Sequence, residues 1–210
     1  MSIRFYYWPK SSAARVWWAL EELGLPYEKV RLYKEKGEHK AESYLAINPN
    51  GVVPGLTDGG ARVFESLSIL LYLAEKYGVE KGLWPAIGSD AAGDAFSWTT
   101  WGSVTMEPPT VDIALHASDL HYALPKEKRD AQVAEKARVR ALQQLGLLER
   151  RLSGRPYTLG NDFTLADVAN VPIIGRLQMC KVPLDAFPSI VAWMRRCTER
   201  AAFSRVMHES

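Results

Sequence analysis

Strand-like segments occur only in the first third of this chain, and from residue 89 onward the pattern is helical. Short runs of β-branched and aromatic residues predict strands, and apolar residues three or four apart predict helices. The predicted order is strand, helix, strand, an intervening segment, then two strands and a helix. The strands are expected at residues 3–8, 30–32, 52–57 and 61–64, and the helices at 11–23 and 66–78. This order predicts a small sheet with one parallel crossover and one hairpin.

The change of pattern predicts two domains. Residues 79–88 contain Gly82, Pro85 and Gly88, a composition typical of a linker. Residues 1–78 are therefore expected to form an α/β domain, and residues 89–210 an all-α domain. The apolar positions of two helices in the second domain are Ala134, Ala137, Ala141, Leu145, Leu148 and Leu152, and then Ile190, Trp193, Met194 and Cys197. Pro108-Pro109 is expected to break or kink the helix that begins near Ser89.

The composition excludes some classes of binding partner. Of the 210 residues 47% are hydrophobic and 24% are charged, as in ordinary globular proteins. A net charge of +2 gives no electrostatic basis for binding nucleic acid or an acidic membrane surface. The apolar run at residues 67–74 is too short to cross a bilayer, and no signal peptide is visible. The two cysteines, Cys180 and Cys197, predict neither a disulfide framework nor a metal site, and they fit a cytoplasmic protein.

The turn after the first strand is the first candidate site. A strand that runs into a helix start directs backbone N–H groups, and the positive end of the helix dipole, at one point. In thioredoxin-like proteins that point carries a Cys-x-x-Cys pair, whereas this chain has Ser11-Ser12-Ala13-Ala14. A serine hydroxyl there can donate a hydrogen bond to the thiolate of a bound ligand. The alternative is that both serines only cap the helix.

Two further segments carry ligand-binding signals. Pro54 stands where a strand begins, and a cis bond there would present the backbone of Val53 to a peptide-like ligand. The alternative is an ordinary trans proline. Glu65-Ser66 ends the last strand at a helix start, which suits a carboxylate. The alternative is a simple N-cap.

Four stretches together resemble the glutathione transferases. They are SSAARVWWALEELGLPYE (11–28), GEHKAESYLAINPNGVVPGL (37–56), FESLSILLYLAEKYG (64–78) and GNDFTLADV (160–168). The resemblance covers nearly the whole chain. It implies a thioredoxin-like domain followed by an all-helical domain, with glutathione as co-substrate and no metal. In the last stretch, Thr164 and Asp167 are placed as a helix capping box, with Phe163 and Val168 as its hydrophobic staple.

The resemblance also implies residue roles. Val53 and Pro54 would pair with the cysteinyl part of glutathione, and Glu65 and Ser66 would hold its γ-glutamyl end. His39 and Lys40 would reach its glycyl carboxylate; the alternative for these two is a solvated loop.

The residue that contacts the thiol sets the class. Serine-type members carry a serine four residues before the Arg-Val of the first helix, which selects Ser11, with Ser12 as the fallback. Some classes use a strand tyrosine instead, for which Tyr6 and Tyr7 are the alternatives. The match is to serine-type, theta- or zeta-like members of bacterial type. The zeta class, which isomerises maleylacetoacetate, reads Ser-Ser-Cys-x-x-Arg, so that resemblance is partial.

The predicted activity is attack of the glutathione thiolate on a hydrophobic electrophile, a detoxification reaction. Candidate residues for the electrophile pocket are Trp8, Trp98, Trp101, Thr105 and Met106; the alternative for each is a core position. The alternative functions are a glutathione-dependent disulfide reductase or isomerase, and a non-catalytic interaction module on the same fold. The resemblance further implies a homodimer.

Overall fold

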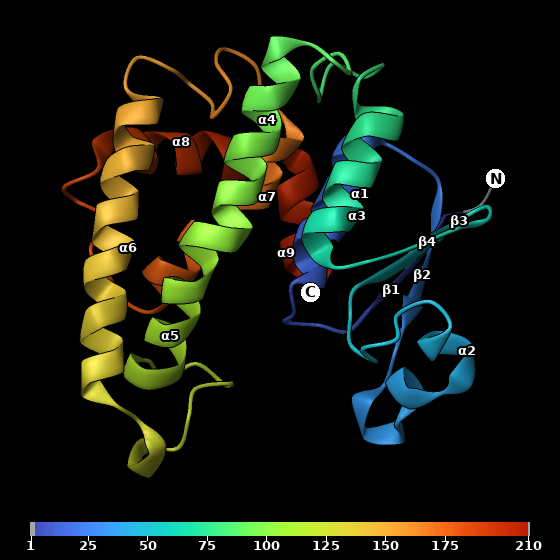
Figure 1. Ribbon diagram of the computed structural model, residues 1–210, viewed down its shortest axis with the longest axis horizontal. Coiled ribbons are helices and arrows are strands. Elements are labelled where there is room, and N and C mark those ends of the chain that lie inside the picture. The colour runs from blue at the N-terminus through green and yellow to red at the C-terminus, as the bar shows by residue number, and fades with distance from the viewer. Residues whose placement is uncertain (1–2, 210) are drawn as a thin grey trace. The chain divides into compact units, whose positions relative to one another are not determined.

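A four-stranded mixed sheet forms the centre of the N-terminal unit in the computed structural model, which describes residues 3–209 (Figure 1). Its strands are β1 (Ile3–Tyr7), β2 (Tyr27–Arg31), β3 (Gly55–Asp58) and β4 (Ala61–Phe64), in the spatial order β2-β1-β3-β4. β1 pairs in parallel with β2 and antiparallel with β3, and β3 pairs antiparallel with β4. The predicted crossover and hairpin are therefore both present.

Two strand boundaries differ from the sequence-based prediction. β2 begins at Tyr27, three residues early, because it is an edge strand whose largely exposed residues give little alternation. β3 begins at Gly55 and not at residue 52. The carbonyl oxygen of Val52 accepts hydrogen bonds from the side chains of Tyr44 and Asn48, so this residue is held by side chains and not by a neighbouring strand.

Helices α1 (Ala13–Leu23) and α3 (Ser66–Leu73) pack against each other beside the sheet. α1 ends at Gly24, whose φ of 58° is the left-handed conformation that glycine adopts without steric cost. α3 continues through a π-helical turn, η3 (Ala74–Gly78). Phe5 and Leu56 have no exposed surface and form part of the core between these helices and the sheet.

The last helix, α9 (Ala201–Glu209), packs against α1. The rings of Trp18 and Phe203 lie 5.0 Å apart in an edge-to-face arrangement. Arg200 donates two hydrogen bonds, of 2.8 and 2.7 Å, to the carboxylate of Glu22. Met1–Ile87 and Glu199–Ser210 accordingly form one compact unit, and Gly88–Thr198 forms a second. The boundaries 1–78, 79–88 and 89–210 stay a prediction.

The segment between β2 and β3 contains short helices only. These are η1 (Lys34–Lys36), η2 (Glu38–Lys40) and α2 (Glu42–Leu45). Tyr44 of α2 is buried, and its ring lies 5.5 Å from the ring of Tyr6 in β1. This contact anchors the connecting segment to the sheet.

The second unit consists of helices. They are α4 (Asp90–Trp101), the π-helical turn η4 (Gly102–Met106), α5 (Glu107–Ala117), η5 (Lys126–Lys128), α6 (Ala131–Leu152), α7 (Leu165–Met179) and α8 (Pro188–Thr198). The predicted apolar stripes of α6 and α8 are both buried. The two prolines stand in the first turn of α5, directly after η4, so the helix is interrupted where a break or kink was predicted.

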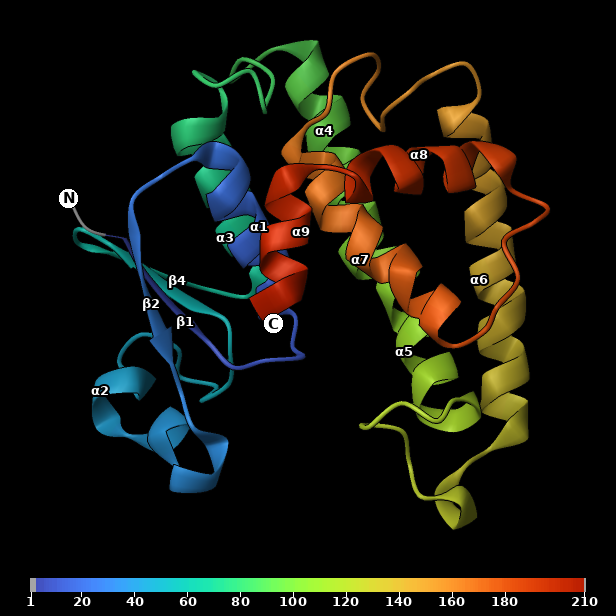
Figure 2. The same ribbon diagram turned by 180° about the vertical axis from the view of Figure 1, so that it is seen from behind.

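Helix α7 lies in the middle of this unit, in contact with α4, α5 and α8 (Figure 2). Its capping box is formed by Thr164 and Asp167, as predicted. Asp167 also accepts hydrogen bonds from the backbone of Thr158 and from the indole of Trp193, at 2.9 and 2.8 Å. Burial raises the pKa of Asp167 despite these bonds. This carboxyl group thus joins α7, α8 and the preceding loop.

Among residues 3–209, no helix has the length and apolar character needed to cross a membrane.

Candidate functional site

The strand register brings the predicted site residues to one edge of the sheet. Tyr7 pairs with Arg31, and Tyr6 pairs with Gly55, which in turn pairs with Phe64. The ends of β1, β2 and β4 and the start of β3 therefore meet at the same edge. Directly beyond this edge follow the turn with Ser11 and Ser12, the segment with His39 and Lys40, the pair Val53-Pro54, and the pair Glu65-Ser66.

The two serines differ in their hydrogen bonds. The Ser11 hydroxyl donates to the main-chain oxygen of Trp8 at 2.7 Å, and its Oγ accepts from the backbone N–H of Ala13 at 3.3 Å. Ser12 occupies the N-cap position of α1 but forms no side-chain cap. The preceding residue, Lys10, has a φ of 56°, a conformation uncommon for residues other than glycine. The Ser11 hydroxyl therefore closes the turn, while the Ser12 hydroxyl is available to form a hydrogen bond with a ligand.

The bond between Val53 and Pro54 is cis, the ligand-presenting one of the two alternatives that the sequence left open. The loop before it is held by Asn48, which is only 1% exposed. The Asn48 amide donates to the oxygens of Val52 and Pro54, at 2.7 and 3.4 Å, and its own oxygen accepts from the backbone of Asn50. Across the described part of the chain, the main-chain N–H and C=O of Val53 have no hydrogen-bond partner. They are free to pair with an extended ligand.

A tyrosine hydroxyl also fixes this loop. The Tyr44 hydroxyl donates to the oxygen of Val52 at 2.6 Å. Burial raises the pKa of Tyr44 to about 12. Its hydroxyl therefore stays protonated, and keeps donating, throughout the physiological pH range.

Glu65 and Ser66 form the start of α3. Glu65 is exposed and has φ 65° and ψ 124°, values that a residue with a side chain rarely adopts. No side chain caps α3. The first N–H groups of this helix, together with the half-buried Ser66, therefore form a start that suits an anion.

His39 and Lys40 lie on η2. The ring of His39 packs edge-to-face on Trp8, with the centroids 5.7 Å apart. Nδ1 of His39 is buried and has no hydrogen-bond partner among the described residues. Nζ of Lys40 donates to the oxygen of Asn50 at 3.2 Å. Both residues are thus tied to this edge of the sheet, through the turn after β1 and through the loop before β3.

The candidates for an electrophile pocket in the helical unit have different environments. Trp98 and Trp101 are half-buried and lie edge-to-face, with the centroids 5.2 Å apart. Thr105 is exposed, and Met106 has no exposed surface at all. Met106 is therefore a core residue of its own unit in this structure.

The alternative strand tyrosines point to opposite faces of the sheet, because they are neighbours in β1. Tyr6 is 7% exposed and packs on Tyr44. Tyr7 is half-buried, with its ring 5.4 Å from that of Trp17 in α1 and 5.5 Å from that of Phe5. Both rings are thus parts of packed clusters.

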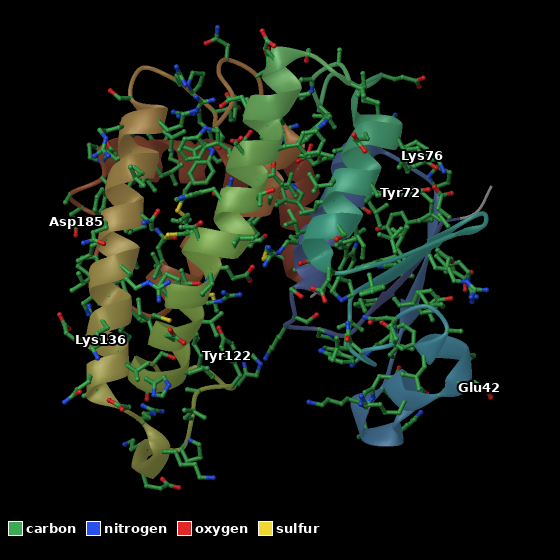
Figure 3. All side chains as sticks on the ribbon, viewed as in Figure 1. Glu42, Tyr72, Lys76, Tyr122, Lys136 and Asp185 are labelled. Carbon is green, nitrogen blue, oxygen red and sulfur yellow. The ribbon has the colours of Figure 1, made fainter. Side chains whose placement is uncertain are left out.

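Sequence reasoning missed a buried carboxylate at the opposite edge of the sheet. Oδ2 of Asp58 accepts from Lys76, Tyr72 and Tyr77, at 2.7, 2.9 and 2.6 Å. Figure 3 shows Tyr72 and Lys76 close together on α3 and its π-helical extension. The sequence predicted only a hairpin turn at Asp58. Its hydrogen-bond partners lie up to 19 residues further along the chain, so no local pattern links them to it. This cluster fastens the hairpin to α3 and lies away from the candidate site.

The fold therefore consists of a thioredoxin-like unit and a separate helical unit. In the first unit, the starts of α1 and α3 and the unpaired main chain of Val53 lie at one edge of the sheet. Residues 1–75 match the family model for the glutathione S-transferase N-terminal domain. Residues 110–201 match the model for the glutathione S-transferase C-terminal domain.

Known proteins agree with these matches. The chain is 30% identical over 200 residues to glutathione S-transferase GstB of Escherichia coli, covering 94% of this chain and 93% of that protein. It is 32% identical over 211 residues to glutathione S-transferase 3 of Zea mays, covering 98% and 93%. Its structure also resembles that of the glutathione transferase URE2P6 of Phanerochaete chrysosporium, which was solved in complex with oxidized glutathione. The superposition has a TM-score of 0.86 and covers 99% of this chain and 95% of that one, and the two sequences are 29% identical. The chain belongs to the glutathione S-transferase family.

Proposed function

We propose that this protein is a serine-type glutathione transferase that binds glutathione at the sheet edge formed by Ser11, Val53-Pro54 and Glu65-Ser66. The observation that carries this proposal is the convergence of these segments through the strand register. The relative from Phanerochaete chrysosporium is described as a complex with oxidized glutathione, which supports the same ligand class here.

Each end of the ligand meets a complementary group. The N–H and C=O of Val53 pair with the cysteinyl part of glutathione, as two neighbouring strands pair. The uncapped start of α3, with Ser66, binds the γ-glutamyl carboxylate, and Glu65 binds its ammonium group. His39 supplies a hydrogen-bond donor for the glycyl carboxylate, and Lys40 supplies positive charge.

The reaction is attack of the glutathione sulfur on an electrophilic carbon. The thiol loses its proton to solvent, the thiolate forms the new sulfur–carbon bond, and the leaving group departs with its electron pair. Ser11 donates a hydrogen bond to the thiolate, which requires its hydroxyl to turn away from the oxygen of Trp8. Because Ser12 forms no side-chain cap, its hydroxyl is a second candidate for this role.

The gain from ionisation is small. A thiol with a pKa of about 8.5 is only ~3% ionised at pH 7. Lowering that pKa by about two units raises the ionised fraction ~25-fold, but the weaker nucleophile loses about eightfold at a Brønsted slope of ~0.45. The net gain of about threefold leaves most of the acceleration to orientation of the thiolate beside the electrophile. Trp8, in the turn after β1, is the proposed contact of that hydrophobic electrophile; Met106, which has no exposed surface, is not assigned to it.

Two assays test the proposal. The protein should be retained on immobilised glutathione, and it should convert an aryl halide faster than hydroxyethyl disulfide. Failure of retention would instead favour a non-catalytic module. Faster turnover of the disulfide would favour a glutathione-dependent reductase. Double substitution Glu65→Ala and Ser66→Ala should abolish retention, whereas Glu42→Ala, an exposed position on α2, should not.

The proposal extends to assembly, location and role. A homodimer is expected, and light scattering should give twice the 23.5 kDa of one chain. A mass of one chain at micromolar concentration would contradict it. A location in the cytoplasm is supported by the low cysteine content of the chain, two residues that are both buried, which fits a reducing compartment. The proposed role there is detoxification of hydrophobic electrophiles.

A further inference from the structure

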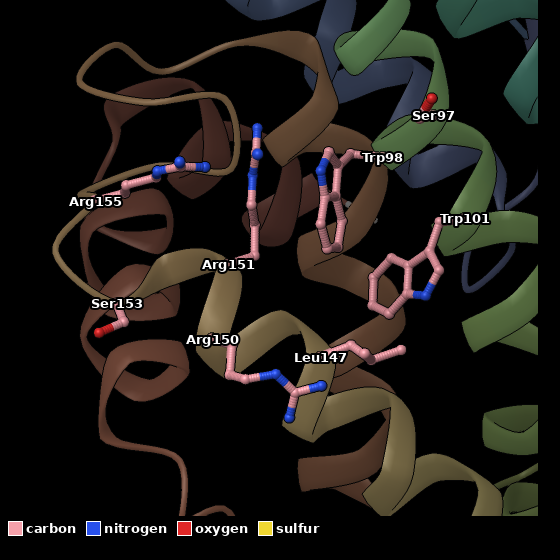
Figure 4. Close-up of a pocket in the computed structure, with 8 residues that line it drawn as sticks. All are labelled: Ser97, Trp98, Trp101, Leu147, Arg150, Arg151, Ser153 and Arg155. Atoms are coloured by element: carbon pink, nitrogen blue, oxygen red, sulfur yellow. The ribbon is translucent and has the colours of Figure 1, made fainter.

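A cavity of about 720 Å³ lies on the face of the sheet opposite α1 and α3. Those two helices cover one face, and α2 lies against the other (Figure 1). Residues of all four strands and of the segment that contains α2 line the cavity. None of the residues proposed to contact glutathione is among them. The lining residues also differ from those of a cavity of about 590 Å³ in the helical unit, which include Trp98 and Trp101 (Figure 4).

A row of three side chains across the sheet brings positive charge to this cavity. In the strand register, Thr57 of β3 lies opposite Arg4 of β1 on one side and opposite Arg62 of β4 on the other. Side chains directly opposite each other in neighbouring strands share a face of the sheet. All three residues accordingly line the cavity. The hydroxyl-bearing Thr57 therefore stands between two arginines.

The two arginines differ in their partners. Arg4 donates two hydrogen bonds, of 2.9 and 3.1 Å, to the carboxylate of Glu28. Arg62 is exposed and donates to the main-chain oxygen of Ala46 at 3.3 Å, and no described residue forms an ion pair with it. The Thr57 hydroxyl forms no hydrogen bond with any residue that the structure describes. An anionic group can thus bind the guanidinium of Arg62 and the hydroxyl of Thr57 together.

The rest of the lining offers polar groups and little aromatic surface. Arg31 and Ser43 are exposed and Glu38 is half-buried, so guanidinium, hydroxyl and carboxylate groups are all present. The rings of Tyr6 and Tyr44 are only 7% and 3% exposed, because they pack on each other. A flat aromatic ligand therefore finds no face on which to stack. A polyhydroxylated group finds both donors and acceptors.

We infer that this cavity binds a small sugar phosphate. The phosphate pairs with Arg62 and accepts a hydrogen bond from Thr57, and the sugar hydroxyls form hydrogen bonds with Ser43 and Glu38. The volume of about 720 Å³ is within the usual size range of small-molecule sites. This inference does not depend on the proposed transferase activity.

The test is calorimetric titration of the whole protein at physiological ionic strength, with glutathione saturating so that its site is occupied. The probe is glucose 6-phosphate, and the comparisons are glucose, inorganic phosphate and adenosine monophosphate. Glucose 6-phosphate should bind with saturation, and about tenfold or more tightly than glucose or inorganic phosphate, because it alone uses both parts of the cavity. Adenosine monophosphate should bind no better than inorganic phosphate.

Substitutions then locate the binding. Arg62→Gln should weaken glucose 6-phosphate about tenfold, the effect of losing one charge-assisted hydrogen bond. Thr57→Val should also weaken it, and Ser43→Ala should weaken glucose 6-phosphate but not inorganic phosphate. Lys81→Gln removes an exposed cation of the same unit outside the cavity, so it is the matched control and should change nothing.

Four outcomes would overturn the inference. The first is the absence of saturable binding, or binding that Arg62→Gln leaves unchanged. The second is equal affinity for glucose 6-phosphate and inorganic phosphate, which would show adventitious anion binding only. The third is tighter binding of adenosine monophosphate than of glucose 6-phosphate. The fourth is a smaller mass of Arg62→Gln in light scattering, because Arg62 would then belong to a contact with a second copy of the chain.

Discussion

The ammonium group of Lys76 lies 2.7 Å from Oδ2 of Asp58, a carboxylate whose side chain has no exposed surface. The same oxygen accepts from the hydroxyls of Tyr72 and Tyr77. Burial by itself raises the pKa of Asp58, but the hydrogen bonds from Lys76, Tyr77 and Tyr72 outweigh it and hold the pKa below its ordinary value. The ion pair therefore stabilises the folded state in its charged form.

Asp58→Asn should lower the free energy of unfolding by about 2 kcal/mol at pH 7, since hydrogen bonds to a charged group are lost. Because the folded-state pKa of Asp58 is lowered, its contribution is present above the unfolded pKa of about 3.9. It is lost as the pH falls through the lower, folded value. Urea unfolding at several pH values should show that the difference in unfolding free energy from the parent shrinks below about pH 4.

Asp185→Asn, an exposed carboxylate on a loop, is the matched control and should show little difference at any pH. A difference for Asp58→Asn that stays constant down to pH 2 would contradict the ion pair.

Gly102→Ala should destabilise the helical unit. A Cβ at this position would overlap the side-chain oxygen of Asn170 on α7, where η4 packs against that helix. The expected cost is about 1–3 kcal/mol, measured from the urea midpoint. Gly93→Ala is the control, because this exposed glycine of α4 has open space around it and should gain about 0.5–1 kcal/mol. Equal effects of the two substitutions would show that packing at Gly102 is unimportant.

Glu65→Gly should separate stability from binding. The φ of 65° at Glu65 is unfavourable for a residue with a Cβ, and glycine should relieve about 1 kcal/mol of it. The same substitution removes the carboxylate proposed to bind the ammonium group of glutathione. A higher melting temperature together with a higher KM for glutathione is therefore expected. A lower melting temperature would show that the backbone is not strained, and an unchanged KM would remove Glu65 from the site.

Local signals in the sequence were enough to predict most of the fold. Gly24 and Ser66 each follow a rule that involves only near neighbours in the chain, and the structure has a left-handed helix end and a helix start at these positions. The cis bond before Pro54 was one of two alternatives that the sequence left open. The capping box of Thr164 and Asp167 is equally local. The convergence of the site segments at one edge depends on the strand order β2-β1-β3-β4, which the predicted crossover and hairpin do not by themselves specify.

Interactions between distant residues could not be predicted in this way. Nothing near Asp58 in the sequence indicates that Lys76 and Tyr77 meet it, because the contact exists only after α3 packs beside the hairpin. The same holds for Arg200 and Glu22, which are 178 residues apart and bring α9 onto α1. The positive φ of Glu65 also has no sequence signal, because residues other than glycine are not expected to adopt it.

The pKa of the bound glutathione thiol tests the central claim most directly. Ultraviolet absorbance of the thiolate, followed against pH with glutathione saturating, should give a pKa of about 6.5 for the parent protein. Ser11→Ala should raise it toward the free value of about 8.5, with little change in glutathione affinity. Ser12→Ala, its neighbour at the same helix start, should leave it unchanged. A thiol pKa in Ser11→Ala equal to that of the parent would contradict the assignment of Ser11.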